Sequence, residues 1–375
     1  MRHSPCCCNI KGALLGDLET GTILYEYNID EPLYIASTTK LMTYCLLMDK
    51  ISKGEASIED EITISEKAAN TWGSKFGMTA GEKIKISTMI DALLVVSGND
   101  VAAAIAEFVG GSEEKFIEMM NAKAKELGLN SAKYINSHGL PDENATPSEN
   151  QLSVRDMFTL VRHILTTYPE ILEVSSKTEL SIPERNYRKA STNPFYKTDE
   201  YVEYNLDGVD GLKTGYTDAA GICLISTMPV SAKTSTSNDY RVISIIMGAD
   251  THPGRKEKSK TLLESGRDDY IYETLCSKDM SEDIYVWNAN DTTVKTYIKE
   301  DYKKIIPNGA KIKTEIVYNE KIEAPLKTGD KVGEMNIYVN DELVNTVDVE
   351  VREEIGKTNI FILIWRFILG LFGVK

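Results

Sequence analysis

The sequence predicts an α+β protein of 375 residues in which a large α+β domain over 11–275 is followed by a small all-β domain over 276–356. An amphipathic helix over 357–375 is expected to end the chain. Three observations favour this division: helical periodicity lies between strand-like segments, short alternating runs follow them, and the last stretch is almost wholly apolar. The first ten residues are expected to be irregular.

The chain opens with a predicted β-hairpin over Gly12–Tyr27, because two short apolar runs flank the turn sequence Glu19-Thr20-Gly21. Hydroxyl residues followed by a nearly continuous apolar run then predict a buried helix over Ser37–Lys50. Ser37 is therefore expected at the N-terminus of that helix.

The middle of the large domain is predicted to be helical, because apolar residues recur three or four positions apart. The predicted helices are Ile86–Val96, Asp100–Val109, Ser112–Leu127 and Val154–Thr166. Strand-like runs follow over Gly208–Thr214, Ala220–Thr227 and Arg241–Gly248. A helix over Ser259–Thr274 is expected to close the domain.

Short alternating apolar and polar runs predict the small β domain. The expected strands are Tyr285–Trp287, Lys311–Tyr318, Glu334–Val339 and Leu343–Val349. The pairs Asn308-Gly309 and Asn340-Asp341 are turn signals between them.

The apolar run Ile360–Val374 would be about 22 Å long as a helix, which is shorter than the roughly 30 Å hydrocarbon core of a bilayer. A helix here would carry one polar edge, formed by Asn359, Arg366, Gly370 and Gly373. We expect it to lie in a membrane interface, where Arg366 and the flanking Lys357 and Lys375 suit anionic headgroups. The alternative is a helix docked on the protein itself.

Charge and cysteine content exclude several classes. A net charge of −15 disfavours a protein that binds nucleic acid, which needs a cationic face. The six cysteines match neither a Cys-x-x-Cys metal site nor a small-domain disulfide framework. We interpret Cys45, Cys223 and Cys276 as core thiols and expect no metal and no cofactor. The adjacent Cys6, Cys7 and Cys8 are interpreted as part of an irrelevant N-terminus; the alternatives are a soft-metal site or a site of lipid attachment.

Ser37-Thr38-Thr39-Lys40 is a Ser-x-x-Lys motif, and three residues along a helix bring two side chains to one face. A serine is a weak nucleophile until a neighbour accepts its proton, and a lysine can do so if burial or nearby positive charge lowers its pKa. The motif alone is weakly specific, because Ser112–Lys115 matches it too and resembles an ordinary helix cap.

Two further motifs follow along the chain. Ser97-Gly98-Asn99 places a hydroxyl and an amide in a break between apolar helices. Lys213-Thr214-Gly215 places a cation and a hydroxyl on a strand, with a glycine that leaves room for a ligand backbone. Each has a second copy, at Ser148–Asn150 and Lys327–Gly329, so specificity depends on order and context.

The motifs at Ser37–Lys40, Ser97–Asn99 and Lys213–Gly215 together match those of β-lactamases and penicillin-binding proteins. From about Gly12 to its end the chain resembles the serine-type D-alanyl-D-alanine carboxypeptidases of the low-molecular-mass penicillin-binding type. The similar segments are GDLETG, IASTTKLMT, SGND, HGLPD and GVDGLKTGYT. The resemblance implies a β-lactamase/transpeptidase-like αβα catalytic domain, raised from the membrane by the β domain.

The resemblance implies acyl transfer on peptidoglycan stem peptides that end in D-Ala-D-Ala. Ser37 would attack the carbonyl of the terminal bond while Lys40 accepts its proton, and Ser97, held by Lys213, would relay a proton to the leaving nitrogen. Water would then hydrolyse the acyl-enzyme. β-Lactams are the expected inhibitors.

Substrate contacts are also carried over from the resemblance. The oxyanion hole would be formed by the backbone N–H groups of Ser37 and Tyr216. Asn99 would bond the side-chain amide of the substrate, and Thr214 would meet its terminal carboxylate. Arg255, in the segment GADTHPGR, is expected to serve the same carboxylate.

Each residue also has a structural interpretation. Ser37 could be only a helix cap, Lys213 a solvated cation at a strand end, and Arg255 a surface ion-pair residue. His138 is expected to be a loop histidine satisfied by the backbone, because this mechanism does not need an imidazole.

Two rival functions are weighed against the carboxypeptidase. A class A β-lactamase usually has Ser-Asp-Asn where this chain has Ser97-Gly98-Asn99, and it needs a deacylating glutamate that Glu149–Ser153 resembles only faintly. It would also lack the β domain and the tail. A non-catalytic cell-wall binder predicts the loss of a motif residue, and none is lost.

The expected location is the extracytoplasmic face of the cell membrane, because the substrate lies there. Met1–Asn9 shows no apolar stretch of an export signal. We therefore expect a truncated or misassigned start.

Overall fold

The computed structural model describes all residues except 1–7, 198, 360, 363, 366–367 and 369–375. The chain forms two compact units. The first comprises Met1–Ser231 and Asp239–Asp269, and the second comprises Ala232–Asn238 and Tyr270–Lys375. The second unit begins at Tyr270, close to the boundary expected at 275/276. Residues 232–238 also belong to the second unit, which was not predicted.

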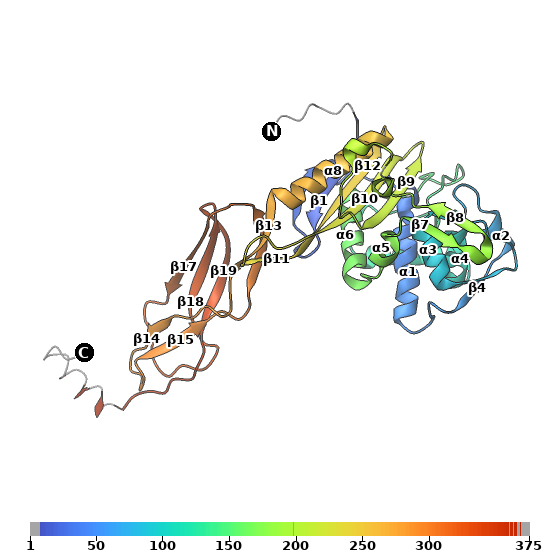
Figure 1. The fold of residues 1–375 in the computed structure, drawn as a ribbon. Coiled ribbons are helices and arrows are strands. Elements are labelled where there is room, and N and C mark those ends of the chain that lie inside the picture. The colour runs from blue at the N-terminus through green and yellow to red at the C-terminus, as the bar shows by residue number, and fades with distance from the viewer. Residues whose placement is uncertain (1–7, 198, 360, 363, 366–367, 369–375) are drawn as a thin grey trace. The chain divides into compact units, whose positions relative to one another are not determined.

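A five-stranded antiparallel sheet organises the first unit, with strand order β2-β1-β12-β10-β9 (Figure 1). Its strands are β1 Gly12–Asp17, β2 Ile23–Tyr27, β9 Gly211–Thr217, β10 Gly221–Val230 and β12 Tyr240–Ala249. The predicted hairpin and the three later strands are confirmed, although β9 begins and ends later than expected. β9 lies at one edge of the sheet.

Helices cover both faces of this sheet. Successive residues of a strand point to opposite faces, so two neighbouring residues of β1 show which helix lies on each face. A Cβ added at Gly16 of β1 would lie 2.4 Å from Phe158 in helix α6 (Val154–Thr167). A Cβ added at Gly266 of helix α8 (His252–Asp268) would lie 3.2 Å from Leu15, the neighbour of Gly16. The first unit is therefore an αβα arrangement.

The remaining elements of the first unit surround one large core. The other helices are α1 Lys40–Ser52, α2 Glu66–Asn70, α3 Ile86–Leu94, α4 Asn99–Gly110, α5 Glu113–Glu126 and α7 Ile171–Ser175. Short strands are β3 Leu33–Tyr34, β4 Glu61–Thr63, β5 Lys83–Lys85, β6 Gln151–Leu152, β7 Glu179–Ile182 and β8 Tyr187–Ala190. The 3-10 turns are η1 Ala36–Thr39, η2 Pro183–Arg185, η3 Pro194–Tyr196 and η4 Val202–Tyr204.

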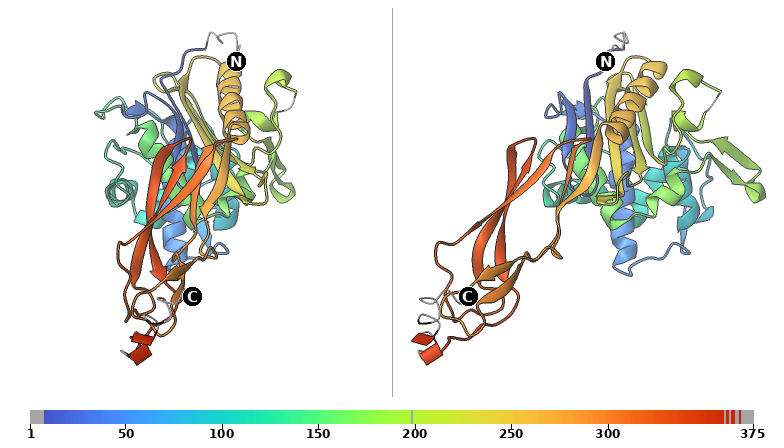
Figure 2. Two further views of the ribbon diagram at one scale, coloured as in Figure 1. Left: turned by 90° about the vertical axis from the view of Figure 1, so that its left-hand side faces the viewer. Right: turned by 60° about the vertical axis from the view of Figure 1, so that its left-hand side comes forward.

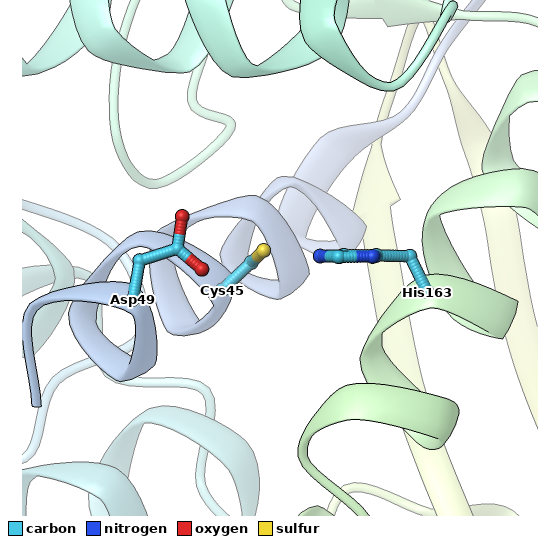
Figure 3. A group of neighbouring side chains, drawn as sticks. All are labelled: Cys45, Asp49 and His163. Carbon is cyan, nitrogen blue, oxygen red and sulfur yellow. The ribbon is translucent and has the colours of Figure 1, made fainter. Parts of the chain in front are cut away.

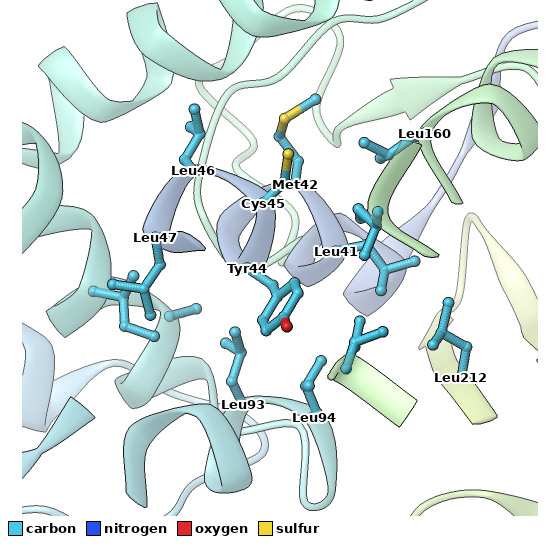
Figure 4. Packing of buried hydrophobic residues seen from close by; sticks show 14 of the residues in the cluster. Leu41, Met42, Tyr44, Cys45, Leu46, Leu47, Leu93, Leu94, Leu160 and Leu212 are labelled. Atoms are coloured by element: carbon cyan, nitrogen blue, oxygen red, sulfur yellow. The ribbon is translucent and has the colours of Figure 1, made fainter. Parts of the chain in front are cut away.

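Helix α1 runs through the middle of this core (Figure 4). Leu41, Met42 and Leu47 have no exposed surface, and Tyr44 is 1% exposed. Apolar side chains therefore surround the helix on several sides, which explains its nearly continuous apolar sequence. Truncating Leu47 to alanine would cost about 2–5 kcal/mol. The first residue of this rigid helix is Lys40.

The predicted boundaries of two helices were wrong. Ser37 lies in the 3-10 turn η1, and the α-helix begins only at Lys40. The helix expected over Ser259–Thr274 is α8, which begins earlier at His252 because Thr251 caps it and a proline follows. Residues 270–276 alternate between half-buried and buried positions and form strand β13.

The second unit is a small β domain with its own hydrophobic core (Figure 2). Its first sheet has order β11-β13-β16 and its second β14-β15-β19-β18-β17. The strands are β11 Ser237–Asn238, β13 Tyr270–Cys276, β14 Asp283–Tyr285, β15 Thr293–Tyr297, β16 Tyr302–Pro307, β17 Ile312–Tyr318, β18 Lys331–Val339 and β19 Glu342–Val351. The predicted β domain is confirmed.

The expected amphipathic helix over 357–375 falls mostly outside the described residues. Of its apolar side chains, Phe361, Ile362, Ile364, Trp365 and Ile368 are described, and all five are exposed. Within the described part of the chain, no helix is long and apolar enough to cross a membrane.

Candidate active site

The motifs of the first unit meet in one cleft of about 300 Å³. Its walls come from η1, from the turn before α4, and from the edge strand β9. The lining residues are Ser37, Ser74, Ser97, Thr192, Lys197, Thr214, Gly215, Tyr216, His252 and Arg255. Six of these were predicted from the sequence.

Lys40 is fully buried and its ammonium nitrogen has three partners. Nζ donates to Ser37 Oγ at 2.9 Å, to Asn99 Oδ1 at 2.7 Å and to the backbone carbonyl of His138 at 2.8 Å. Although η1 is not an α-helix, the three-residue separation still brings Ser37 and Lys40 together. This contact is the geometry that a lysine base requires.

The second pair in the cleft joins two other motifs. Lys213 Nζ donates to Ser97 Oγ at 2.8 Å and to the carbonyl of Thr214 at 3.0 Å. Ser97 has a φ of 59°, a left-handed conformation that a non-glycine residue adopts at a cost. The strained turn before α4 therefore holds the Ser97 hydroxyl against a strand residue 116 positions later.

Burial changes the pKa of both lysines. It lowers the pKa of Lys213 to about 7, because no solvent stabilises the charged form. Burial, together with the positive charge of Lys213, lowers the pKa of Lys40 well below its usual value. An uncharged Lys40 can accept a proton from Ser37, which the charged form cannot.

Both the oxygen and the nitrogen of the Asn99 side-chain amide make a hydrogen bond within the protein. Oδ1 accepts from Lys40 and Nδ2 donates to the carbonyl of Trp72 at 2.9 Å. Nδ2 carries a second N–H besides the one that Trp72 accepts, so the expected bond to an amide of the substrate stays a prediction. Asn99 also orients the amine that faces Ser37.

Two glycines allow other segments to approach the backbone around Ser37. A Cβ at Gly215 would lie 3.1 Å from the Ser37 nitrogen and 3.1 Å from the Ile35 carbonyl. Gly139, with a φ of 88°, lies so close to η1 that a Cβ would be 2.0 Å from the Ala36 carbonyl oxygen. The predicted space beside Gly215 therefore receives η1, and the next residue, Tyr216, is 59% exposed at the cleft.

Thr214 and Arg255 lie in the same cleft, as the resemblance implies. Arg255 is 7% exposed, and its Nη1 donates to the Cys223 carbonyl at 3.4 Å. Its Nε is buried without a hydrogen-bond partner. Burial lowers the pKa of Arg255 to about 10, which leaves it charged at neutral pH. It is therefore a buried cation with donors to offer a carboxylate, and not a surface ion-pair residue.

The His138 side chain behaves as expected for a loop histidine, but its backbone also takes part in the site. Its Nδ1 accepts from the Leu140 N–H at 3.1 Å, which agrees with a ring satisfied by the backbone. Burial and the charges of Lys40 and Lys67 lower the pKa of His138 to about 3, so the ring is neutral. Its carbonyl, however, is a partner of Lys40, and a carbonyl gives no signal in a sequence.

Other cleft residues were missed. Ser74, Thr192, Lys197 and His252 line the cleft. His252 could have been suspected, because it stands three residues before Arg255 in the segment already singled out. The other three lie in loops whose sequence carries no comparable motif.

The second copies of the motifs have structural roles. Ser112 caps α5 by accepting from the Lys115 N–H at 3.3 Å. Lys327 lies in a turn of the β domain, where its N–H donates to Asp330 at 2.7 Å. Glu149 accepts from Thr217 Oγ1 at 2.6 Å and so fixes the end of β9.

One group of possible metal ligands lies outside the cleft lining. Figure 3 shows His163 of α6 pointing toward Cys45 of α1, and the ligand atoms of these two and Asp49 lie within 4.8 Å of one another. Asp49 already accepts from Tyr168 at 2.5 Å and pairs with Lys123 at 3.0 Å. Burial raises the pKa of Cys45 to about 12, so the thiol stays protonated. These contacts favour a structural role.

The first unit combines three features: an αβα fold, a buried lysine that faces a serine, and an edge strand beside them. These features define a class of serine hydrolases that form acyl-enzymes. The comparisons with known proteins specify the family. A family model described as "D-alanyl-D-alanine carboxypeptidase" matches residues 2–251. A second model, described as "Penicillin-binding protein 5, C-terminal domain", matches residues 270–357. The chain belongs to the D-alanyl-D-alanine carboxypeptidase family, whose members are serine-type peptidases of cell-wall biogenesis.

Individual relatives agree over nearly the full length. The chain is 29% identical to D-alanyl-D-alanine carboxypeptidase DacF of Bacillus subtilis, over 97% of this chain and 90% of that protein. The structure of penicillin binding protein 5 from Haemophilus influenzae is similar with a TM-score of 0.74 and 27% identity, over 95% of this chain and 100% of that one. Penicillin-Binding Protein D2 from Listeria monocytogenes, in its cefotaxime-bound form, has a TM-score of 0.58 and 29% identity over 68% of this chain and 96% of that one.

Proposed function

We propose that Ser37 is the acylated nucleophile with which this carboxypeptidase removes the terminal D-Ala from peptidoglycan stem peptides. The observation that carries the proposal is the fully buried Lys40 amine, 2.9 Å from Ser37 Oγ. Because the pKa of this buried amine is lowered, more of it is in the uncharged form that can accept the serine proton.

In the acylation step, Ser37 Oγ forms a bond to the carbonyl carbon of the terminal peptide as its proton passes to Lys40. The carbon–nitrogen bond then breaks, and Ser97 Oγ gives its proton to the leaving nitrogen of D-alanine. Lys213, which donates to Ser97, returns a proton to it. Transfer of the proton that Lys40 accepted, through solvent, to Lys213 then restores both amines. In the second step, water attacks the ester and gives its proton to Lys40, and Lys40 passes this proton to Ser37 Oγ as the ester bond breaks.

Substrate binding follows from the walls of the cleft. The N–H groups of Ser37 and Tyr216 are proposed to bind the oxygen that becomes negative during attack. The hydroxyl of Thr214 and the free donors of Arg255 are proposed to hold the terminal carboxylate. Asn99 supports the reaction by orienting Lys40.

The substrate places the protein outside the cytoplasmic membrane. Residues 357–375 are proposed to attach it there, because they contain three basic residues and no acidic residue, and their described apolar side chains are exposed. The orientation of this segment as an amphipathic helix is part of the proposal.

The test is acylation by benzylpenicillin, followed by intact mass while the loss of the drug is measured. We expect a single persistent adduct on the wild type and on Ser112→Ala, the matched control in which another Ser-x-x-Lys serine is changed. Ser37→Ala should form no adduct and should release no D-alanine from a peptide ending in D-Ala-D-Ala. An adduct on Ser37→Ala would refute the assignment, whereas rapid drug turnover without an adduct would indicate a β-lactamase.

A further inference from the structure

The β domain exposes two aromatic side chains that touch each other. Tyr285 ends strand β14, and Trp287 lies two residues further along the chain. Each is 54% exposed, and their rings pack edge to face with centroids 5.4 Å apart and planes at 87°. Two exposed aromatic rings in contact offer more apolar surface in one place than a single exposed ring, so the pair is a candidate for an interaction surface.

The backbone that carries these rings is fixed. The Trp287 N–H donates to the Ile322 carbonyl at 2.8 Å, and the Ala324 N–H donates to the Trp287 carbonyl at 2.9 Å. Tyr285 pairs with Thr293 at the end of β14, and Trp287 forms a β-bridge with Glu323, so hydrogen bonds hold the backbone of both residues.

The C-terminal segment leaves the β domain directly beside this pair. The Asn290 N–H donates to the Gly356 carbonyl at 3.2 Å, and the Thr358 N–H donates to the Asn288 carbonyl at 2.8 Å. Ala289 and Lys357 form the β-bridge between these two hydrogen bonds. The exposed aromatic pair and the start of the basic, apolar tail thus belong to one end of the domain.

We propose that Tyr285 and Trp287 insert into the interface of an anionic lipid membrane, as a second attachment point beside the tail. Tyrosine and tryptophan favour the headgroup level of a bilayer, because each ring has an apolar body and a polar group. A second point adds affinity to that of one amphipathic segment and also fixes the rotation of the domain about it. The inference rests on the membrane attachment proposed for residues 357–375.

The test uses the three tryptophans of the chain as separate reporters. Three full-length variants each keep Trp72, Trp287 or Trp365 and carry phenylalanine at the other two positions. They are mixed with phosphatidylglycerol–phosphatidylcholine vesicles whose acyl chains carry bromine, which quenches nearby tryptophan emission. We expect quenching and a blue shift for Trp287 and Trp365, and no change for Trp72, which is 60% exposed in the first unit.

A second measurement gives the contribution of the pair to binding. The double variant Tyr285→Ala/Trp287→Ala should partition onto these vesicles about tenfold less than the wild type. The matched control Tyr25→Ala/Tyr27→Ala changes two residues of β2 that are 45% and 49% exposed, and it should bind like the wild type.

Three outcomes would overturn the inference. If Trp365 responds and Trp287 does not, the tail alone binds the membrane; if neither responds, the membrane attachment itself is wrong. If the double variant binds vesicles normally but loses binding to isolated peptidoglycan, the pair is a glycan surface. Acylation of each variant by benzylpenicillin is measured in parallel, so that failure of the proposed enzymatic function is seen separately.

Discussion

Lys40 and Lys213 are both buried, and the positive charge of Lys213 acts on the pKa of Lys40. The pKa of Lys213 is lowered to about 7 by burial, and its positive charge contributes to the lowered pKa of Lys40. Lys40 has to be neutral to accept the serine proton, so the rate of acylation should rise with pH as this amine loses its proton. The positive neighbour therefore moves activity toward neutral pH.

Replacing Lys213 with methionine should shift this rise to higher pH. Loss of the positive charge raises the pKa of Lys40, so a higher pH is needed to deprotonate it. The measurement is the rate of acylation by benzylpenicillin between about pH 5 and pH 10, with Lys327→Met as the control that changes the other Lys-Thr-Gly motif. A smaller rate with an unmoved pH profile would show that Lys213 does not set the pKa of Lys40.

Gly139 is expected to tolerate no side chain. Its φ of 88° and the close Ala36 carbonyl mean that Gly139→Ala must displace η1, which carries Ser37. We expect a loss of stability of at least about 2 kcal/mol and at least a tenfold slower acylation. Urea unfolding and adduct formation measure the two effects.

The matched control is Gly128→Ala, which has a φ of 73° and no atom within 4 Å of the added Cβ. It should cost only about 1 kcal/mol, from backbone strain, and should leave acylation unchanged. Equal loss of acylation in both variants would mean that general destabilisation, and not displacement of η1, is responsible.

At the scale of elements, Asp100 of helix α4 anchors the loop that contributes Trp72 and Ser74 to the site. Its carboxylate accepts from the Phe76 N–H at 3.0 Å and from the Gly77 N–H at 2.8 Å. Asp100 has no exposed surface, so its replacement leaves two backbone donors of the loop without a partner.

We expect Asp100→Ala to destabilise the protein by about 2–4 kcal/mol and to slow acylation, because the loop also holds Asn99 through Trp72. Denaturant unfolding and the acylation rate are the measurements. Asp91→Ala, which removes a partly exposed pair with Lys177, should change stability by less than about 1 kcal/mol. Normal acylation by Asp100→Ala would show that the loop does not position the site.

Most of the elements could be predicted from the sequence, because apolar periodicity and turn residues specify them locally. The site motifs could be predicted because their side chains have distinctive chemistry at fixed spacing. Two backbone partners were not predictable: the His138 carbonyl, which accepts from Lys40, and the Trp72 carbonyl, which accepts from Asn99. Strand β11, two residues long, is specified by its pairing with β13 and not by its own pattern.

At the scale of the whole molecule, we expect the first unit to perform acylation and the C-terminal segment to attach the protein to the membrane. The two hydrophobic cores belong to different units, so removal of the tail should not disturb the cleft. A chain that ends at Gly356 should therefore be acylated at the wild-type rate within about twofold.

The same truncated chain should bind anionic vesicles at least about tenfold less than the full chain, as measured by co-sedimentation. Thermal unfolding is the control, because the described residues of the segment whose backbone pairs with the β domain are Lys357 and Thr358. Unchanged vesicle binding would place the attachment elsewhere in the molecule.

The position of β9 at the edge of the five-stranded sheet has a consequence for what the cleft can accept. An edge strand has backbone groups without a neighbouring strand, and it tends to pair with any extended chain that reaches it. Here that edge lies in a cleft with walls, so a second folded protein should not pair with it. A peptide end is narrow enough to reach β9 and to pair with it through backbone groups that every peptide shares. Discrimination among peptides is then expected to come from Thr214 and Arg255, which are proposed to bind the carboxylate at which the chain stops.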